Sequence, residues 1–344
     1  MSAIKACIHD GFVYFPTLKI NPKFLYRIFE GSTCYDGLGK WGTQLNLNTD
    51  TIGSIRVALA PDAELEPLLA FLDRETSKID GLVGEQRRLI ELLKEKRQAV
   101  ISHAVTKGLN PNAPLKPSGI EWLGDVPEHW EMMRVKHLTR SIEQGWSPQC
   151  EGFPVEDESE WGVLKVGCVN SGTFNAQENK VLPGDLDPIP SLAISTGDLL
   201  ISRANTRELV GRAAVAVEDY PNLMLCDKLY RLRLKPDIAS SSFLSLYLGS
   251  SEARGPIELG ATGASASMVN IAQSTVLELD ISVPPIDEQL AIEYAIQRET
   301  QKIDALTAEA ERGIELLQER RTALISAAVT GKIDIREFVE SKTT

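Results

Sequence analysis

The chain has 344 residues, 36 of them basic and 48 acidic, and its formal net charge is −12. Its 43% hydrophobic and 24% charged residues are typical of a folded globular protein and exclude global disorder. No apolar run reaches the ~18 residues that a membrane span needs, no secretory signal begins the chain, and the cysteines are widely spaced. We therefore expect a cytoplasmic protein with no membrane partner, no disulfide framework and no zinc site.

Residues 1–60 match only the last part of a later segment, residues 120–285. Phe24-Leu25 returns there as Phe243-Leu244, and apolar residues near the end of each segment also correspond. We therefore predict that residues 1–60 are the C-terminal part of a domain of which residues 120–285 form a complete copy.

Two motifs in this first segment partly match enzyme signatures. Gly37, Gly39 and Gly42 have the spacing of a dinucleotide-binding loop, but polar residues follow them where such a loop needs a helix start. Asn21-Pro22-Lys23-Phe24 is similar to the Asn-Pro-Pro-Phe/Tyr loop of amino-methyltransferases, yet its third residue is Lys and no glycine-rich cofactor motif precedes it. We interpret the first as a glycine-rich loop and the second as a turn before a helix that begins near Phe24.

An internal repeat occupies residues 61–109 and returns in residues 286–332. Arg74-Glu75-Thr76-Ser77-Lys78-Ile79-Asp80 recurs 224 positions later as Arg298-Glu299-Thr300-Gln301-Lys302-Ile303-Asp304, and 21 of the 33 positions between 74 and 106 are identical. Apolar residues three and four apart along both copies indicate a coiled-coil seam. Because a helix of ~45 residues is ~70 Å long, too long for a small domain to cover, we predict that the two helices pack on each other. The alternative is that both lie on a globular core.

Between the repeats, residues 110–119 have the Pro, Asn and Gly content of a linker. Residues 120–285 contain short β-branched runs, such as 162–169, 199–202 and 213–217, which indicate a mixed α/β domain. Residues 333–344 form a C-terminal tail. The sequence thus predicts an α+β protein in which mixed α/β domains are joined by two long helices.

Basic residues cluster within a domain that is acidic as a whole. Residues 120–285 carry 13 bases and 23 acids, a net of −10. Three arginines nevertheless lie close together in their sequence. Two are in the segment 203–207 (Arg-Ala-Asn-Thr-Arg), which follows a predicted strand, and Arg212 comes after it. Arg can pair with guanine and Asn with adenine in the major groove. The alternative is that these arginines neutralise nearby carboxylates. For Lys228–Lys235, the alternation of basic and apolar residues also fits a strand with one solvated face.

The residues reveal no catalytic site. The four histidines have no metal-ligand spacing, and neither a Ser/His/Asp set nor paired carboxylates stand out.

The motifs and their order resemble the DNA-specificity subunit of type I restriction-modification systems. Pro284-Pro285-x-x-Glu288-Gln289-x-x-Ile292 is similar to the start of that family's conserved helices, and the Arg-Glu-Thr-x-Lys-Ile-Asp repeat matches the helices themselves. Pro127-Glu128-His129-Trp130-Glu131 resembles the opening of a target-recognition domain. Gly197–Arg203, with Gly211-Arg212 after it, resembles the middle of that domain.

This resemblance implies a non-catalytic DNA reader. Two target-recognition domains would each read half of a split site in double-stranded DNA, and the two helices would pair antiparallel as a ruler between them. Two modification (methyltransferase) subunits would bind the helices, and restriction (motor and nuclease) subunits would join them. The chain itself would bind no cofactor, and S-adenosylmethionine, ATP and Mg would belong to the partner subunits.

The first recognition domain departs from the family pattern because it begins midway. One interpretation is that the true start of this domain lies upstream. Another is that the chain is a shortened subunit that reads one half-site and associates with a second copy of itself. A coiled-coil scaffold that no longer reads DNA is the competing class, and an autonomous methyltransferase or nuclease is a third. The expected DNA contacts are Arg203, Asn205, Thr206, Arg207, Arg212, Lys228, Thr262, Ser265 and Ser267. The net charge predicts weak DNA binding by this chain alone, because phosphate neutralisation dominates affinity.

Overall fold

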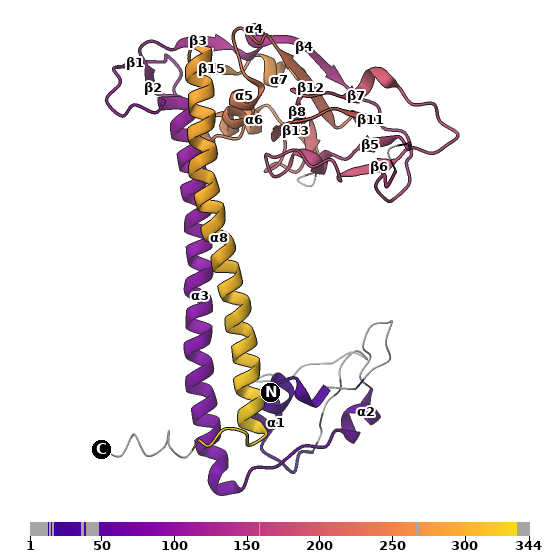
Figure 1. Cartoon of the computed structure of the whole chain (residues 1–344), viewed down its shortest axis with the longest axis vertical. Coiled ribbons are helices and arrows are strands. Elements are labelled where there is room, and N and C mark those ends of the chain that lie inside the picture. Colours follow the sequence, from indigo (N-terminus) through magenta and orange to yellow (C-terminus); the bar gives the residue numbers. More distant parts are fainter. Residues whose placement is uncertain are drawn as a thin grey trace. The chain divides into compact units, whose positions relative to one another are not determined.

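The computed structural model describes Val13, Phe15, residues 17–35, Leu38 and residues 48–157, 159–265 and 268–335. The chain divides into two compact units, one of Met1–Leu93 with Ala305–Thr344 and one of Lys94–Asp304. We call them the first and second unit. Each contains part of both long helices, α3 (Asp62–Lys107) and α8 (Ile286–Val329), which are purple and orange to yellow in Figure 1.

The ends of the long helices follow from their sequence. α3 begins directly after Pro61 and α8 directly after Pro285, where a missing backbone N–H costs nothing. Gly108 and Gly331 follow the last turns with φ of 75° and 71°. Glycine adopts this left-handed conformation without the steric cost of a Cβ, so both helices stop there.

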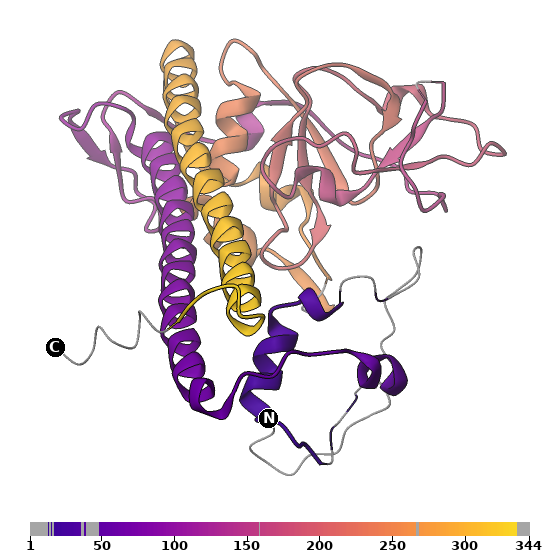
Figure 2. The same cartoon turned by 60° about the horizontal axis from the view of Figure 1, so that its bottom comes forward.

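The two helices lie side by side and run antiparallel (Figures 1 and 2). In the first unit Arg321 Nε lies 2.8 Å from Asp80 Oδ1, and in the second unit Arg97 Nε lies 3.2 Å from Asp304 Oδ1. The repeat relates these two ion pairs to each other, because Asp304 corresponds to Asp80 and Arg321 to Arg97. The predicted antiparallel pairing of the helices is confirmed.

The first unit also contains α1 (Pro22–Glu30), a 3₁₀ turn η1 (Thr33–Tyr35) and α2 (Thr49–Ser54). Asn21 caps α1, since its Oδ1 accepts from the backbone N–H of Lys23 at 2.9 Å and of Phe24 at 3.4 Å. The prediction of a turn before a helix is therefore confirmed. Phe24 and Ile28 of α1 are buried against α3 and α8. Gly37, Gly39 and Gly42 lie outside the described residues.

The second unit holds the remaining elements. The helical elements between the long helices are α4 (Val135–Leu138), η2 (Val166–Val169), η3 (Pro190–Leu192), α5 (Ser241–Leu248), α6 (Ser251–Leu259) and α7 (Gln273–Leu277). The strands are β1 (Leu115–Pro117), β2 (Asp125–Pro127), β3 (Glu131–Arg134), β4 (Thr139–Gln144), β5 (Gly162–Leu164), β6 (Asn179–Val181), β7 (Ala193–Ile194), β8 (Leu199–Ser202), β9 (Ala204–Asn205), β10 (Ala213–Val215), β11 (Tyr220–Met224), β12 (Leu229–Leu234), β13 (Thr262–Ser265), β14 (Met268–Asn270) and β15 (Asp280–Val283).

A central antiparallel sheet has the strand order β10-β8-β12-β4. A second sheet, β6-β5-β11-β7, is antiparallel except for the parallel pair β5 and β11. Smaller sheets join β13-β14-β9, β15-β3 and β1-β2. This mixture of helices and sheets agrees with the α+β class expected from the sequence.

Strand β8 separates two hydrophobic cores. Leu199 and Ile201 point into a core shared with α5 and both long helices, whereas Leu200 points into the core of the second sheet. Because side chains alternate along a strand, a strand buried on both faces needs a continuous apolar run. This explains the Leu-Leu-Ile run at 199–201.

Two sequence expectations differ from the structure. The expected strand at 162–169 ends at Leu164, and a 3₁₀ turn follows, because the chain bends back there to carry β6 to the sheet edge. The expected solvated face of the strand at 228–235 is wrong at Arg231. Its side chain is 1% exposed and lies beneath the segment that carries Ser191 and Ala193, whose carbonyl groups accept hydrogen bonds from its guanidinium.

Two of the motif residues, Trp130 and Gln289, pack beside α5. Gln289 is fully buried and accepts from the backbone N–H of Ser240, the cap of α5, while its amide donates to the carbonyls of Ile238 and Pro284. Trp130 is also fully buried and meets Phe243 of α5 edge to face. These motif residues therefore serve packing.

No helix in the described part of the chain is long and apolar enough to cross a membrane. Among the described side chains, no three or more His, Cys, Asp or Glu are grouped so that they could hold a metal ion.

Candidate nucleic-acid interface

The segment 203–207 lies where three strands meet. Arg203 links β8 to β9, and the backbone N–H groups of Arg203 and Ala204 donate to the carbonyl of Lys228 at 2.9 and 3.3 Å. β9 pairs with β14, and the N–H of Ile271 donates to the carbonyl of Arg203 at 3.0 Å. The fold thus brings Arg203 and Lys228, which are distant in sequence, next to each other.

The hairpin β13–β14 extends the same small sheet. Thr262 is exposed, and it pairs with Asn270, which in turn pairs with Ala204 of β9. Ser265 belongs to β13, where its backbone pairs with Met268. Ser267 lies outside the described residues. The hairpin therefore lies beside the segment 203–207.

Asn205 lies in the interior instead of on the surface. Its side chain is 9% exposed, its Nδ2 donates to Asn170 Oδ1 at 2.9 Å and to Ser202 Oγ at 3.3 Å, and its Oδ1 accepts from the N–H of Thr206. Both ends of the amide are satisfied inside the domain, which favours a structural role as the anchor of this segment.

Arg207, Thr206 and Arg212 differ in their exposure and in their contacts. Arg207 is exposed, and its Nη1 donates to the carbonyl of Glu258 at 3.3 Å. The hydroxyl of Thr206 is buried and has no hydrogen-bond partner among the described residues. Arg212 is half-buried and lines a cavity beside α5. We call Arg203, Arg207 and Lys228 the basic cluster.

Several bases of the domain have carboxylate partners that the members of the basic cluster lack among the described residues. Arg231 and Arg233 face the carboxylates of Glu143 and Asp198, and Arg134 and Lys136 share Glu278. Within the described residues, the ion pairs include none for the basic cluster. Arg203 instead donates to the backbone carbonyl of Asp227 at 3.2 Å. Among the described residues, no carboxylate therefore neutralises the charge of the basic cluster.

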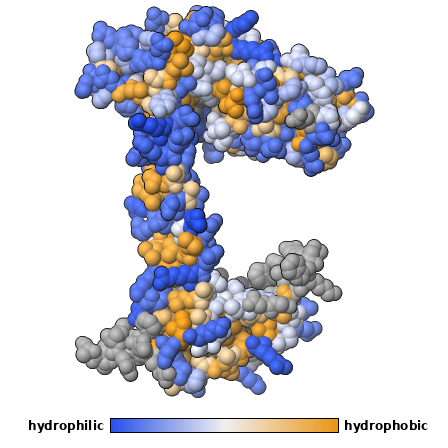
Figure 3. Space-filling view, in the orientation of Figure 1, coloured by the Kyte–Doolittle hydropathy of each residue, from blue (hydrophilic) through white to orange (hydrophobic). Residues whose placement is uncertain are grey.

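A second surface lies on the part of the paired helices that belongs to the first unit. Figure 3 shows separate hydrophobic patches on this stem. Its exposed leucines are Leu82, Leu89 and Leu92 of α3 and Leu306 and Leu316 of α8.

All five lie one residue before a seam position, so they share one flank of each helix. Leu306 and Leu316 are the repeat equivalents of Leu82 and Leu92. We call this surface the leucine face.

Comparisons with known proteins show what the chain is similar to. No protein-family model matches it. The specificity subunit of the type I restriction enzyme EcoEI from Escherichia coli is 32% identical over 208 residues, 60% of this chain and 35% of that relative. The specificity subunit of EcoKI from Escherichia coli strain K12 is 20% identical over 292 residues, 84% of this chain and 60% of that relative. The chain is related to type I restriction enzyme specificity subunits.

The chain thus spans 35% and 60% of the length of these two relatives. A solved structure described as "Structural basis underlying complex assembly and conformational transition of the type I R-M system" has a TM-score of 0.65 with this chain. The two are 17% identical, and the match covers 91% of this chain and 72% of that one. At this identity the likeness supports the fold alone.

Proposed function

We propose that this chain is a non-catalytic specificity subunit that reads double-stranded DNA for a type I restriction-modification complex. In this proposal residues 120–285 form a target-recognition domain and residues 1–60 the C-terminal part of another. Residues 61–109 and 286–332 form the ruler between the two half-sites, with 110–119 as the linker and 333–344 as the tail. The relatedness to specificity subunits supports this role.

The observation that carries the DNA-reading role is the basic cluster. Arg203, Arg207 and Lys228 have no carboxylate partner among the described residues, in a domain where several other arginines, such as Arg231 and Arg233, are neutralised. The hairpin β13–β14, with Thr262 exposed, lies beside them and adds polar groups. Arg contributes bidentate contacts to guanine or to phosphate, and Lys contributes a point charge to phosphate.

The change Arg203→Ala is expected to weaken specific DNA binding by about 1–3 kcal/mol if it removes a bidentate base contact. Lys228→Ala is expected to weaken binding to all sequences equally and to reduce the salt dependence, because it removes a phosphate contact. The measurement is the affinity of the chain assembled with its modification subunit, in gel shifts at several salt concentrations, for a duplex selected from random sequences.

Arg140→Ala is the matched control. Arg140 is exposed on β4 and follows Thr139, which pairs with Leu234 at the end of β12 away from Lys228. Its loss should leave the affinity unchanged. Equal affinities of the Arg203→Ala and Arg140→Ala complexes would remove Arg203 from the interface.

The leucine face supports the proposal that the chain binds two copies of one partner protein. Because the repeat duplicates Leu82 and Leu92 as Leu306 and Leu316, two copies of one protein can bind equivalent surfaces of the stem. We infer that these copies are the two modification subunits, which would bring S-adenosylmethionine, while the restriction subunits would bring ATP and Mg.

Selecting, from a pool of random duplexes, the DNA sequence that the complex binds also distinguishes between the alternative functions. A split target of two unlike halves supports reading by two recognition domains within one chain. An inverted repeat of one half-site supports a shortened reader that associates with a second copy of itself. Failure to select any sequence would support a coiled-coil scaffold that does not read DNA and would contradict the proposed function.

A further inference from the structure

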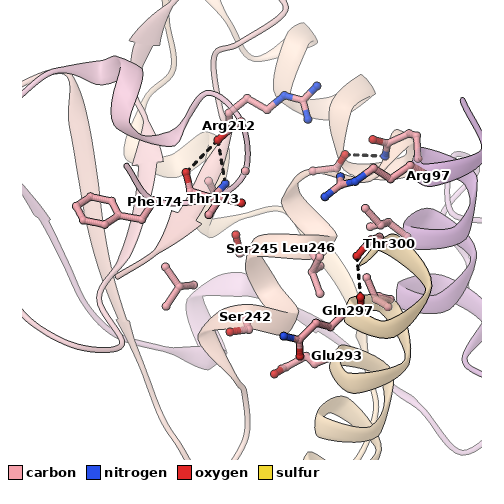
Figure 4. A pocket seen from close by; sticks show the side chains of 18 of the residues that line it. Arg97, Thr173, Phe174, Arg212, Ser242, Ser245, Leu246, Glu293, Gln297 and Thr300 are labelled. Carbon is pink, nitrogen blue, oxygen red and sulfur yellow. Dashed lines mark hydrogen bonds between the residues drawn. The ribbon is translucent and has the colours of Figure 1, made fainter. Parts of the chain in front are cut away.

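A cavity of about 380 Å³ lies in the second unit where β10 and α5 meet the paired helices α3 and α8 (Figure 4). Arg97 of α3 and Arg212 lie on one side of it in this view, and Glu293 of α8 lies on the other. Ser242 and Ser245 of α5 also line it. The cavity therefore combines two guanidinium groups with hydroxyl groups and one carboxylate.

Arg212 lacks an acceptor here. Its Nε is buried and has no hydrogen-bond partner within the described part of the chain, where the ion pairs also include none for this residue. Burial lowers the pKa of Arg212, and the neighbouring charge of Arg254 lowers it further, while Glu258 acts in the opposite direction. A half-buried cation without an acceptor is costly, so this guanidinium would gain from an anion.

The equivalent place in the first unit contains such an anion. Arg321, the repeat equivalent of Arg97, donates to Asp80 at 2.8 Å and to Glu30 Oε1 at 3.0 Å. Glu30 ends α1, the helix that matches α5 through Phe24-Leu25 and Phe243-Leu244. By that sequence match, Gly249, which directly follows α5, corresponds to Glu30.

At the position of Glu30, the second unit thus has no carboxylate, although Glu293 lies elsewhere in the cavity lining. Arg97 keeps its contact with Asp304 at 3.2 Å, but Gly249 offers only its carbonyl, which accepts from Gln98 at 2.8 Å. A Cβ placed on Gly249 would lie 4.0 Å from Arg212 Nη1 and no closer than 3.5 Å to any other atom outside its chain neighbours. A carboxylate in this cavity therefore has room beside Arg212 and faces Arg97.

We propose that this cavity binds a carboxylate group, which takes in the second unit the place that the Glu30 side chain occupies in the first. The group comes either from a free small carboxylate or from an acidic side chain of a partner subunit. This inference stands apart from DNA reading, because it rests on the cavity and on its counterpart at Glu30.

Glutarate, which resembles a glutamate side chain, is the probe for the free source. Calorimetric titration of the full-length chain should show saturable binding, and the ¹⁵N signal of Arg212 Nε should shift. Arg212→Gln should weaken the binding by about 10- to 100-fold, as expected for loss of a charge-assisted hydrogen bond. Gly249→Glu should abolish it, because the new side chain fills the site from within the chain.

Gly255→Glu is the matched control for Gly249→Glu. It adds the same charge on α6, where a Cβ would meet no atom within 4 Å, and it should leave glutarate binding unchanged. Circular dichroism and the melting temperature check that each variant is folded. If Gly249→Glu fails to fold, Arg212→Gln alone decides the question.

The partner source is tested by adding the purified modification subunit to the labelled chain. A shift of the Arg212 signal that glutarate reverses supports an acidic side chain of that subunit, and a response to glutarate alone supports a free carboxylate. The proposal is overturned if neither changes the signal. It is equally overturned if inorganic phosphate or duplex DNA binds at Arg212 more tightly than glutarate.

Discussion

Arg231→Met should lower the free energy of unfolding of the second unit by about 3–5 kcal/mol, the usual cost of removing one partner from a buried ion pair. The side chains of Arg231 and Asp198 are 1% and 2% exposed, and their Nη1 and Oδ2 atoms lie 3.4 Å apart. Arg231 also donates to Glu143 and to the carbonyls of Ser191 and Ala193. Methionine fills similar space but leaves these acceptors without a donor.

The loss of stability comes from the hydrogen bonds and ion pairs of Arg231, because few other donors can replace its guanidinium. Asp198 retains Arg233 Nε at 2.8 Å and the N–H of Ser195 at 3.0 Å, so it stays partly compensated. Glu143 keeps a more distant contact with Arg233 at 3.8 Å, and the two carbonyls lose the hydrogen bonds that Arg231 supplies. Unsatisfied buried acceptors cost about 1–3 kcal/mol each, which is consistent with the expected total.

Urea denaturation followed by tryptophan fluorescence measures this effect. Trp146 and Trp161 pack against the core of the second sheet and report on the structure around Arg231. Arg140→Met is the control, because Arg140 is exposed on the same sheet and its loss should change the stability by less than about 0.5 kcal/mol. A change below about 1 kcal/mol for Arg231→Met would mean that water or movement of the covering segment replaces the guanidinium.

The long helices could be predicted from sequence because their signal is local and doubled. A heptad seam and a repeat with 21 identities in 33 positions define both of them, and Pro61, Gly108 and Gly331 mark their ends. Their pairing follows from length alone, since no small domain could cover such a helix.

Arg231 shows a limit of prediction from sequence patterns. Alternation along a strand tells which residues share a face, but not whether another segment covers that face. The segment that covers Arg231 carries Ser191 and Ala193, about forty positions earlier in the chain. The carboxylates that compensate the charge, Glu143 and Asp198, come from two further strand regions. Such a site depends on contacts between distant segments, so the sequence alone could not reveal it.

The sequence predicts the candidate interface as separate segments, and it does not show which of their residues reach the surface. Arg203, Lys228 and Thr262 come from three separate segments, and the pairing of β9 with β14 brings them together. Asn205 has the residue type that reads adenine, yet Asn170 and Ser202 hold its amide inside the domain. The role of such a polar residue depends on whether internal partners satisfy it, and only the tertiary structure shows this.

Glutamate substitutions on the leucine face should change the number of modification subunits that the chain binds. The ion pairs Asp80–Arg321 and Arg97–Asp304 fix which residues of the two helices lie level with each other. On this register Leu82 lies within about one turn of Leu316, and Leu92 within about one turn of Leu306. The leucine face therefore contains two equivalent patches, Leu82 with Leu316 and Leu92 with Leu306.

The double variant Leu82→Glu/Leu316→Glu should bind one modification subunit, and so should Leu92→Glu/Leu306→Glu. The four-fold variant should bind none. Burying a leucine contributes about 1.5–3 kcal/mol, and a buried carboxylate without a partner opposes binding further. Native mass spectrometry and sedimentation velocity with the purified modification subunit give the stoichiometry directly.

Leu259→Glu separates an effect of the patches from a general effect of added charge. Leu259 is 89% exposed on α6, away from the stem, and its substitution should leave two modification subunits bound. The helices themselves should be unaffected, because the substituted leucines are about half exposed and lie beside the seam, so the helical circular dichroism should not change. Equivalent losses from the two double variants are the signature of a repeated surface. If only one double variant loses a subunit, the repeat has diverged into two different sites, and if both keep two subunits, partner binding lies elsewhere on the chain.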